Sequence, residues 1–155
     1  MAYVIAGLDP APFRHLFGRS DDELAAVGVI RMTADAKPGF PCRVTLEDAE
    51  PGEDLLLLNY EHLAVDTPYR SRHAIFVRDG AAEVARFADE VPEQLSRRLL
   101  SVRAFDSAGM MTDADVIEGT ELDPLIRRMF DDPVVEYLHV HNAKRGCFAA
   151  EVRRD

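Results

Sequence analysis

The chain has 155 residues, of which 47% are hydrophobic, so it can bury the core of one ordinary domain. Its 28 acidic and 18 basic side chains give a net charge of −10, which argues against nucleic acid or an anionic membrane as a partner. No apolar run approaches the ~20 residues of a membrane span, the first residues lack a secretory signal, and two cysteines make no disulfide framework. We therefore expect a cytoplasmic protein with one domain over residues 1–155.

The first part of the chain predicts a strand followed by two short helices. The run "YVIAGL" (3–8) is typical of a strand. A short helix is expected directly after Asp9, a residue type that caps helix N-termini. Ser20 with Glu23 three residues later is a capping box, which begins a second short helix that ends at Gly28.

The middle of the chain predicts several strands separated by turns. Segment 55–62 opens with four leucines, so we expect both of its faces to be covered and the strand to be central in its sheet. Segment 63–72 is a long polar loop, and 110–119 is ambiguous. Further strands are predicted at 29–34, 42–46, 73–80 and 101–107.

Two helices and a hairpin follow from the second half. Pro92 begins a helix through about Leu100, and the apolar stripe of 121–130 predicts another helix. Strands 134–141 and 147–154 are joined by a tight turn. The fold class expected is α+β: a single domain with a largely antiparallel or mixed sheet, three to four short helices and a C-terminal β-hairpin.

The turn of this hairpin decides which side chains share a face. Gly146 favours a three-residue loop (144–146) that ends in a left-handed residue, with His141 facing Ala149 and His139 facing Glu151. A five-residue loop keeps the same parity, whereas a four-residue loop moves Cys147 to the opposite face. The odd loops place these residues on one polar face: Tyr137, His139, His141, Cys147, Ala149 and Glu151. Leu138, Val140 and Phe148 then form the core face.

Histidines at i and i+2 of a strand can chelate one metal ion. A third ligand would be one of Cys147, Glu151, Cys42 and His62. No CxxC, HxxxH or carboxylate-rich ligand set accompanies the pair, and hydrogen-bonded histidines are the ordinary alternative. We therefore assign no metal and no cofactor from the sequence.

A nucleophile is the second chemical interpretation. Cys147 or Cys42 would attack, His139 or His141 would act as the base, and Glu151 or Asn142 would orient it. The alternative is a small residue packed in a sheet, which is what most free cysteines are. A disulfide between the two cysteines requires neighbouring strands and is disfavoured in a reducing cytoplasm.

Several segments carry a family resemblance. The stretches "PGFPCRVTLEDAEPGEDLLLLNYEH", "PYRSRHAIFVRDG", "RLLSVRAFDSAGMM" and "YLHVHNAKRGCFAAEV" resemble a bacterial family catalogued as domain of unknown function 1203. The resemblance covers essentially the whole chain and implies a small bacterial cytoplasmic protein. It brings no activity, catalytic residue or cofactor.

Two functions are compatible with these observations. The first is a small-molecule enzyme or ligand-binding protein with a His/Cys/Arg pocket at the hairpin, whose basic side chains would hold a small anion. Its catalytic residues would be His141, Cys147 and His139, and its ligand-binding residues would be Cys42, Arg43, His62, Tyr69, Arg70 and Asn142. The alternative is a non-catalytic interaction module, for example a homodimer, that pairs through an exposed hairpin face.

Overall fold

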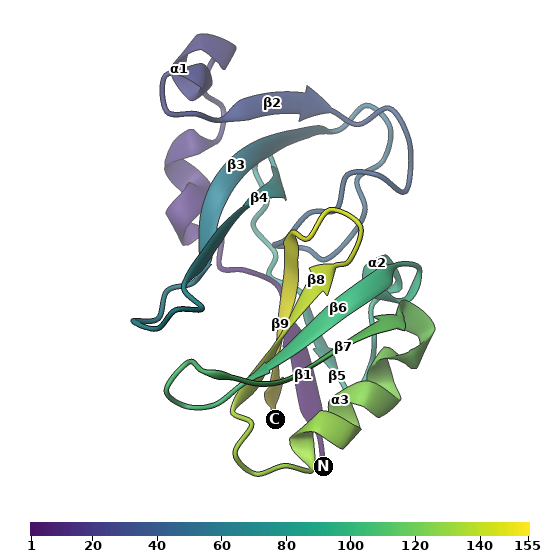
Figure 1. Cartoon of the computed structure of the whole chain (residues 1–155). Helices are drawn as coiled ribbons and strands as arrows, with labels where there is room; N and C mark the ends of the chain where they lie inside the picture. The colour runs from purple at the N-terminus through teal and green to yellow at the C-terminus, as the bar shows by residue number, and fades with distance from the viewer.

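The chain folds into two antiparallel sheets, which stand one above the other in Figure 1. A computed structural model describes all 155 residues. Across the six-stranded sheet the order is β5 (Arg86–Ala88), β1 (Tyr3–Ala6), β9 (Phe148–Arg154), β8 (Tyr137–Asn142), β6 (Leu99–Phe105) and β7 (Met111–Glu118). The three-stranded sheet has the order β2 (Ile30–Thr33), β3 (Asp54–Leu63) and β4 (Ser71–Arg78). Every neighbouring pair of strands is antiparallel, so the predicted α+β class is confirmed.

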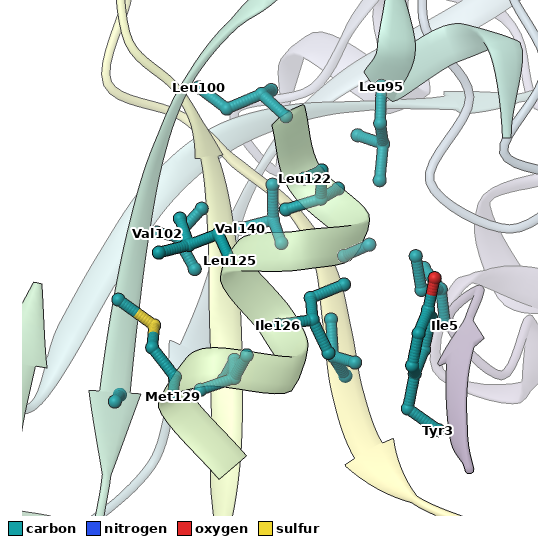
Figure 2. Packing of buried hydrophobic residues seen from close by; sticks show 14 of the residues in the cluster. Tyr3, Ile5, Leu95, Leu100, Val102, Leu122, Leu125, Ile126, Met129 and Val140 are labelled. Atoms are coloured by element: carbon teal, nitrogen blue, oxygen red, sulfur yellow. The ribbon is translucent and has the colours of Figure 1, made fainter. Parts of the chain in front are cut away.

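The helix α3 (Leu122–Phe130) lies across one face of the six-stranded sheet and closes the main core (Figure 2). A short 3-10 turn, η2 (Gly119–Glu121), leads into it. All five apolar residues of its predicted stripe are buried. They pack against Val102 of β6 and Val140 of β8 in a cluster of 18 buried residues. The helix therefore covers one face of the sheet and leaves the opposite face to the rest of the molecule.

The three-stranded sheet has its own apolar cluster. The 3-10 helix η1 (Ala11–Leu16) contributes Phe13, and α1 (Asp21–Ala25) contributes Leu24. Both pack against β3 and β4 in a cluster of 11 buried residues. The Ser20 side chain accepts a hydrogen bond from the Glu23 backbone N–H at 3.2 Å, as the predicted cap requires. The leucine-rich strand β3 is central in this sheet, as predicted.

A buried arginine links the two sheets through the segment between β2 and β3. Arg43 is 1% exposed and donates hydrogen bonds to the carbonyl oxygens of Phe148 at 2.7 Å and Pro41 at 2.6 Å. These contacts fix the segment around Pro41 to the end of the β8–β9 hairpin, which reaches up to the small sheet in Figure 1. Because a buried guanidinium needs its donors satisfied, this arrangement holds the hairpin tip in place.

Four elements differ from the prediction or were left open by it. Segment 42–46 is wrong as a strand: Leu46 N–H bonds back to the Cys42 carbonyl, and Cys42 makes only an isolated bridge to Phe76. The helix predicted to run from Pro92 to about Leu100 ends early, as α2 (Glu93–Ser96), because residues from Leu99 onward pair as β6. The ambiguous segment 110–119 forms the edge strand β7, and β5 was not predicted.

Candidate functional site

The β8–β9 hairpin has a different register at its tip from the one predicted. Asn142 N–H donates to the Cys147 carbonyl, and Gly146 N–H donates to the Asn142 carbonyl, so the turn holds four residues. Gly146 takes the expected left-handed conformation, with φ of 78°. The pairing then shifts between Val140 and His141, because Ala149 is an extra residue in β9.

The extra residue Ala149 forms a β-bulge, and Cys147 and Phe148 lie on the faces opposite to those predicted. His139 faces Glu151, as predicted, but His141 faces Phe148 and not Ala149. Phe148 therefore joins the histidine face, whereas Cys147 points to the other side, as a four-residue loop requires. The prediction that Cys147 shares a face with the two histidines is wrong, and so is the placement of Phe148 in the main core.

Three histidines converge on the face that α3 leaves free. His139 and His141 come from β8, and His62 comes from β3 of the other sheet, beside an irregularity between Tyr60 and Leu63. One ring nitrogen of each histidine lies within 4.8 Å of the others. His139 and His141 are each only 1% exposed, and His62 is partly exposed. The cluster thus spans the junction of the two sheets.

Aromatic side chains surround the cluster. The Phe148 ring stacks on His62, with centroids 5.2 Å apart and planes 7° apart, and meets His139 edge-on at 4.9 Å. Phe105 and Tyr137 lie 5.4 and 5.3 Å from His139. These rings leave the imidazoles few hydrogen-bonding partners, so each polar contact of the histidines is informative.

Hydrogen bonds define which ring nitrogens carry lone pairs. Nδ1 of His141 lies 2.9 Å from the Gly146 carbonyl oxygen, which can only accept, so this nitrogen donates and Nε2 keeps its lone pair. Nε2 of His139 lies 3.3 Å from the Glu151 carboxylate and donates in the same way, so in the neutral ring the lone pair is on Nδ1. Nδ1 of His139 and Nδ1 of His62 are buried and have no hydrogen-bond partner.

Burial favours the neutral form of two of the three imidazoles. Burial lowers the pKa of His141 to about 3, against the opposing hydrogen bond to Gly146 and with help from the charge of Arg103. Burial, His139 and Arg103 lower the pKa of His62 to about 4. The pKa of Glu151 is below its usual value because hydrogen bonds from His139 and Arg153 outweigh the effect of burial. At neutral pH His62 and His141 are therefore neutral imidazoles, and the Glu151 carboxylate beside His139 is ionised.

Arg103 of β6 stands next to the histidines. It pairs with His139 across the β6–β8 ladder, and Ser101 pairs with His141. Both side chains lie on the histidine face, because the alternating residues Leu100, Val102 and Ala104 belong to the core under α3.

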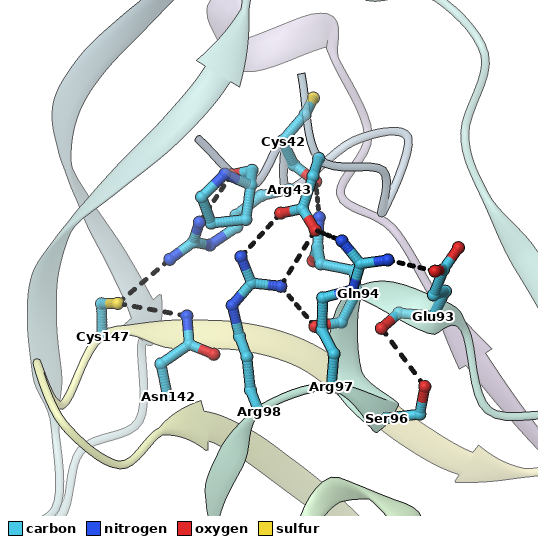
Figure 3. Close-up of polar contacts among 11 residues, drawn as sticks. Cys42, Arg43, Glu93, Gln94, Ser96, Arg97, Arg98, Asn142 and Cys147 are labelled. Atoms are coloured by element: carbon cyan, nitrogen blue, oxygen red, sulfur yellow. Dashed lines mark hydrogen bonds and ion pairs between the residues drawn. The ribbon is translucent and has the colours of Figure 1, made fainter. Parts of the chain in front are cut away.

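The thiol predicted as a nucleophile sits in a separate polar cluster (Figure 3). Cys147 Sγ accepts hydrogen bonds from Arg43 at 3.1 Å and from Asn142 at 3.5 Å. Arg98 and Arg97 are held nearby by the buried carboxylate of Asp48. Cys147, Arg43 and Asn142 are thus brought together as predicted, but on the side of the hairpin away from the histidines.

Of the predicted ligand-binding residues, His62 joins the other histidines, whereas Cys42, Tyr69 and Arg70 do not. Cys42 packs in the apolar cluster of the small sheet, and its sulfur accepts the Arg78 backbone N–H. Both cysteines are free thiols. Arg70 is engaged by Glu61 at the surface, and Tyr69 packs edge-on against Phe105 at 6.3 Å, behind the aromatic wall.

Two surface cavities lie away from the histidines. A cavity of about 460 Å³ is lined mainly by acidic residues, among them Glu47, Asp48 and Glu93. A smaller one of about 200 Å³ is lined by residues such as Thr45 and Arg78. Neither contains a residue of the predicted His/Cys/Arg pocket. His139 and His141 are buried, so the histidine site is a packed cluster in which His62 is the partly exposed member.

Sequence reasoning overlooked two residues of this site. Phe148 was assigned to the core, since a single-residue bulge is not visible in the sequence. Arg103 was not considered, although "LLSVRAF" places Ser101 and Arg103 at alternate positions between buried apolar residues. That alternation marks both as members of a polar face; only the pairing of β6 with β8 shows that the face is the histidine one.

The family expectation is confirmed. A family model described as "Protein of unknown function (DUF1203)" matches residues 39–154. The chain belongs to this family. The matched residues include β3, β6, β8 and β9, which together carry the three histidines, Arg103 and Glu151. No curated protein and no solved structure matches the chain. None of its helices is both long and apolar enough to cross a membrane.

Proposed function

We propose that the protein binds one divalent transition-metal ion, zinc being the first candidate, through His62, His139 and His141, and that this ion is the centre of a small-molecule-binding or catalytic site. The observation that carries the proposal is the approach of three ring nitrogens to within 4.8 Å of one another. Tetrahedral ligands about 2.1 Å from zinc lie about 3.4 Å apart, so small rotations of the rings would bring the nitrogens onto an ion.

The outer contacts of the histidines support the same proposal. Metal-bound histidines ordinarily donate their second N–H to a carboxylate or a backbone carbonyl. His139 has the Glu151 carboxylate in this role, and His141 has the Gly146 carbonyl. The buried, unpartnered Nδ1 of His139 is the lone pair that a metal ion would satisfy.

Three neutral nitrogen ligands favour a reactive rather than a purely structural ion. Structural zinc sites are closed by four protein ligands, whereas catalytic ones keep a position for water or substrate. No cysteine or carboxylate lies in the three-histidine group. An ion held here would keep its full +2 charge and an open position, which suits the polarisation of a bound ligand or the activation of water.

The interaction-module alternative loses its main support. That hypothesis needs a hairpin face that is flat and exposed, but His139 and His141 are each 1% exposed and are covered by Phe148 and by β3. A homodimer through another surface stays a prediction.

Metal analysis of protein purified without a histidine tag tests the proposal. We expect about one equivalent of metal per chain, and after removal by chelator one equivalent of zinc should rebind. His139→Gln should weaken zinc binding at least tenfold, because it removes a ligand, whereas His15→Gln on the exposed surface serves as the matched control. Equal zinc affinity of both variants and the parent would overturn the proposal.

A further inference from the structure

We infer that Arg103 and the proposed metal ion together bind a small oxyanion, the group that carboxylates and phosphate esters share. This inference rests on the proposed metal site and names the class of ligand that the site would take. Its basis is an arginine that stands beside the histidine cluster with no acidic partner.

The position of Arg103 follows from the sheet register. Side chains directly opposite each other on antiparallel strands have β-carbons about 4.5–5.5 Å apart. Arg103 is opposite His139, and Ser101 is opposite His141. Arg103 and Ser101 therefore lie on the same face as the two histidines of β8, opposite the face that α3 covers.

Arg103 is a partly buried cation whose donors are almost unused. Its one hydrogen bond runs from Nε to the Ser101 hydroxyl at 3.4 Å, and neither terminal nitrogen has a partner. Burial lowers the pKa of Arg103, and no salt bridge to a carboxylate offsets this effect. Glu151 lies on β9, beyond β8, and its carboxylate is already engaged by His139 and Arg153.

The charges of the proposed site indicate that an anion would bind beside the metal ion. A divalent ion on three neutral imidazoles, next to an unpaired guanidinium, makes a strongly positive site inside a chain of net charge −10. The metal ion and the guanidinium repel each other, and an anion between them would offset this repulsion by attracting both. A guanidinium presents paired N–H donors that match two oxygens of a carboxylate or phosphate, and one oxygen could also reach the open position of the ion. The oxyanion would thus be held from two sides.

Cobalt(II) provides a spectroscopic test, because an ion with three nitrogen ligands changes its visible spectrum when a fourth ligand binds. The chelator-treated full-length protein would be loaded with cobalt(II) and titrated with acetate, inorganic phosphate and neutral imidazole. We expect Arg103→Met to weaken acetate or phosphate at least tenfold and to leave imidazole affinity within twofold. Arg103→Lys should restore part of the anion affinity. Arg145→Met, at the exposed hairpin turn, is the matched control and should bind as the parent does.

The outcomes separate the two claims. Failure of the parent protein to bind cobalt(II) overturns the metal site and the anion site together. Normal cobalt(II) binding with anion affinities that change less than threefold in Arg103→Met overturns the anion site alone. An equal loss of imidazole and anion binding also overturns it, since Arg103 would then only shape the site. Comparison of acetate with phosphate identifies which oxyanion the parent prefers.

Discussion

Acidification should destabilise the metal-free protein through His141. Burial lowers the pKa of this imidazole to about 3, whereas in an unfolded chain a histidine titrates near 6.5. Between these values the unfolded state binds a proton that the folded state excludes. Stability therefore rises with pH in this window and falls as the pH drops below about 6.5.

The expected size of this effect follows from linkage. Between pH 7.5 and pH 5.0, an unfolded histidine with a pKa of ~6.5 changes from mostly neutral to almost fully protonated, which costs the folded state about 2 kcal/mol for His141 alone. His62, whose pKa is lowered to about 4 and which is less buried, should add to the loss in the same direction.

Urea denaturation of chelator-treated protein at several pH values between 7.5 and 5.0 measures this loss. His141→Gln should remove about 2 kcal/mol of the pH-dependent change, whatever its effect on stability at pH 7.5. His15→Gln, which lacks an exposed imidazole, should keep the parent's pH dependence. The same slope in His141→Gln as in the parent would refute the account of a buried, neutral imidazole.

Three further changes test other parts of the structure. Glu151→Gln should weaken zinc binding about tenfold in calorimetric titration, because the carboxylate orients His139. The control Glu136→Gln, at an exposed position, should bind zinc as the parent does. Equal zinc affinities of the two variants would show that Glu151 does not support the site. Arg43→Leu should lower the free energy of unfolding, measured in urea, by about 3 kcal/mol, because the carbonyl oxygens of Phe148 and Pro41 lose their donor. A loss under 1 kcal/mol would contradict the role of Arg43 in linking the two sheets. Ile126→Ala should cost about 3 kcal/mol by leaving a cavity under α3, and a neutral result would mean that the helix does not close this core.

The elements with strong periodicity could be predicted from the sequence. The apolar stripe of α3, the cap at Ser20 and the leucine run of β3 each depend on residues close together in the chain, and each was confirmed. Segment 42–46 failed because its alternation suits a strand, whereas its backbone closes a local turn around buried Arg43. Tertiary contacts of one side chain outweighed the local pattern there.

The candidate site could be predicted only in part. His139 opposite Glu151 was predicted from a three-residue loop and is confirmed, because the four-residue turn and the one-residue bulge together give the same pairing. One extra residue, Ala149, then reversed the faces of Cys147 and Phe148, which no pattern of hydrophobicity reveals. His62 and Arg103 reach the site through sheet pairing and the stacking of two sheets, and these are long-range contacts that a single sequence does not encode in its spacing.

The metal site can be examined most directly by X-ray diffraction from crystals of the zinc-loaded protein, with data collected on both sides of the zinc absorption edge. We expect one strong anomalous peak within bonding distance, about 2.1 Å, of Nδ1 of His139, Nε2 of His141 and one ring nitrogen of His62. A peak at another position, or none between these three rings at stoichiometric zinc, would contradict it.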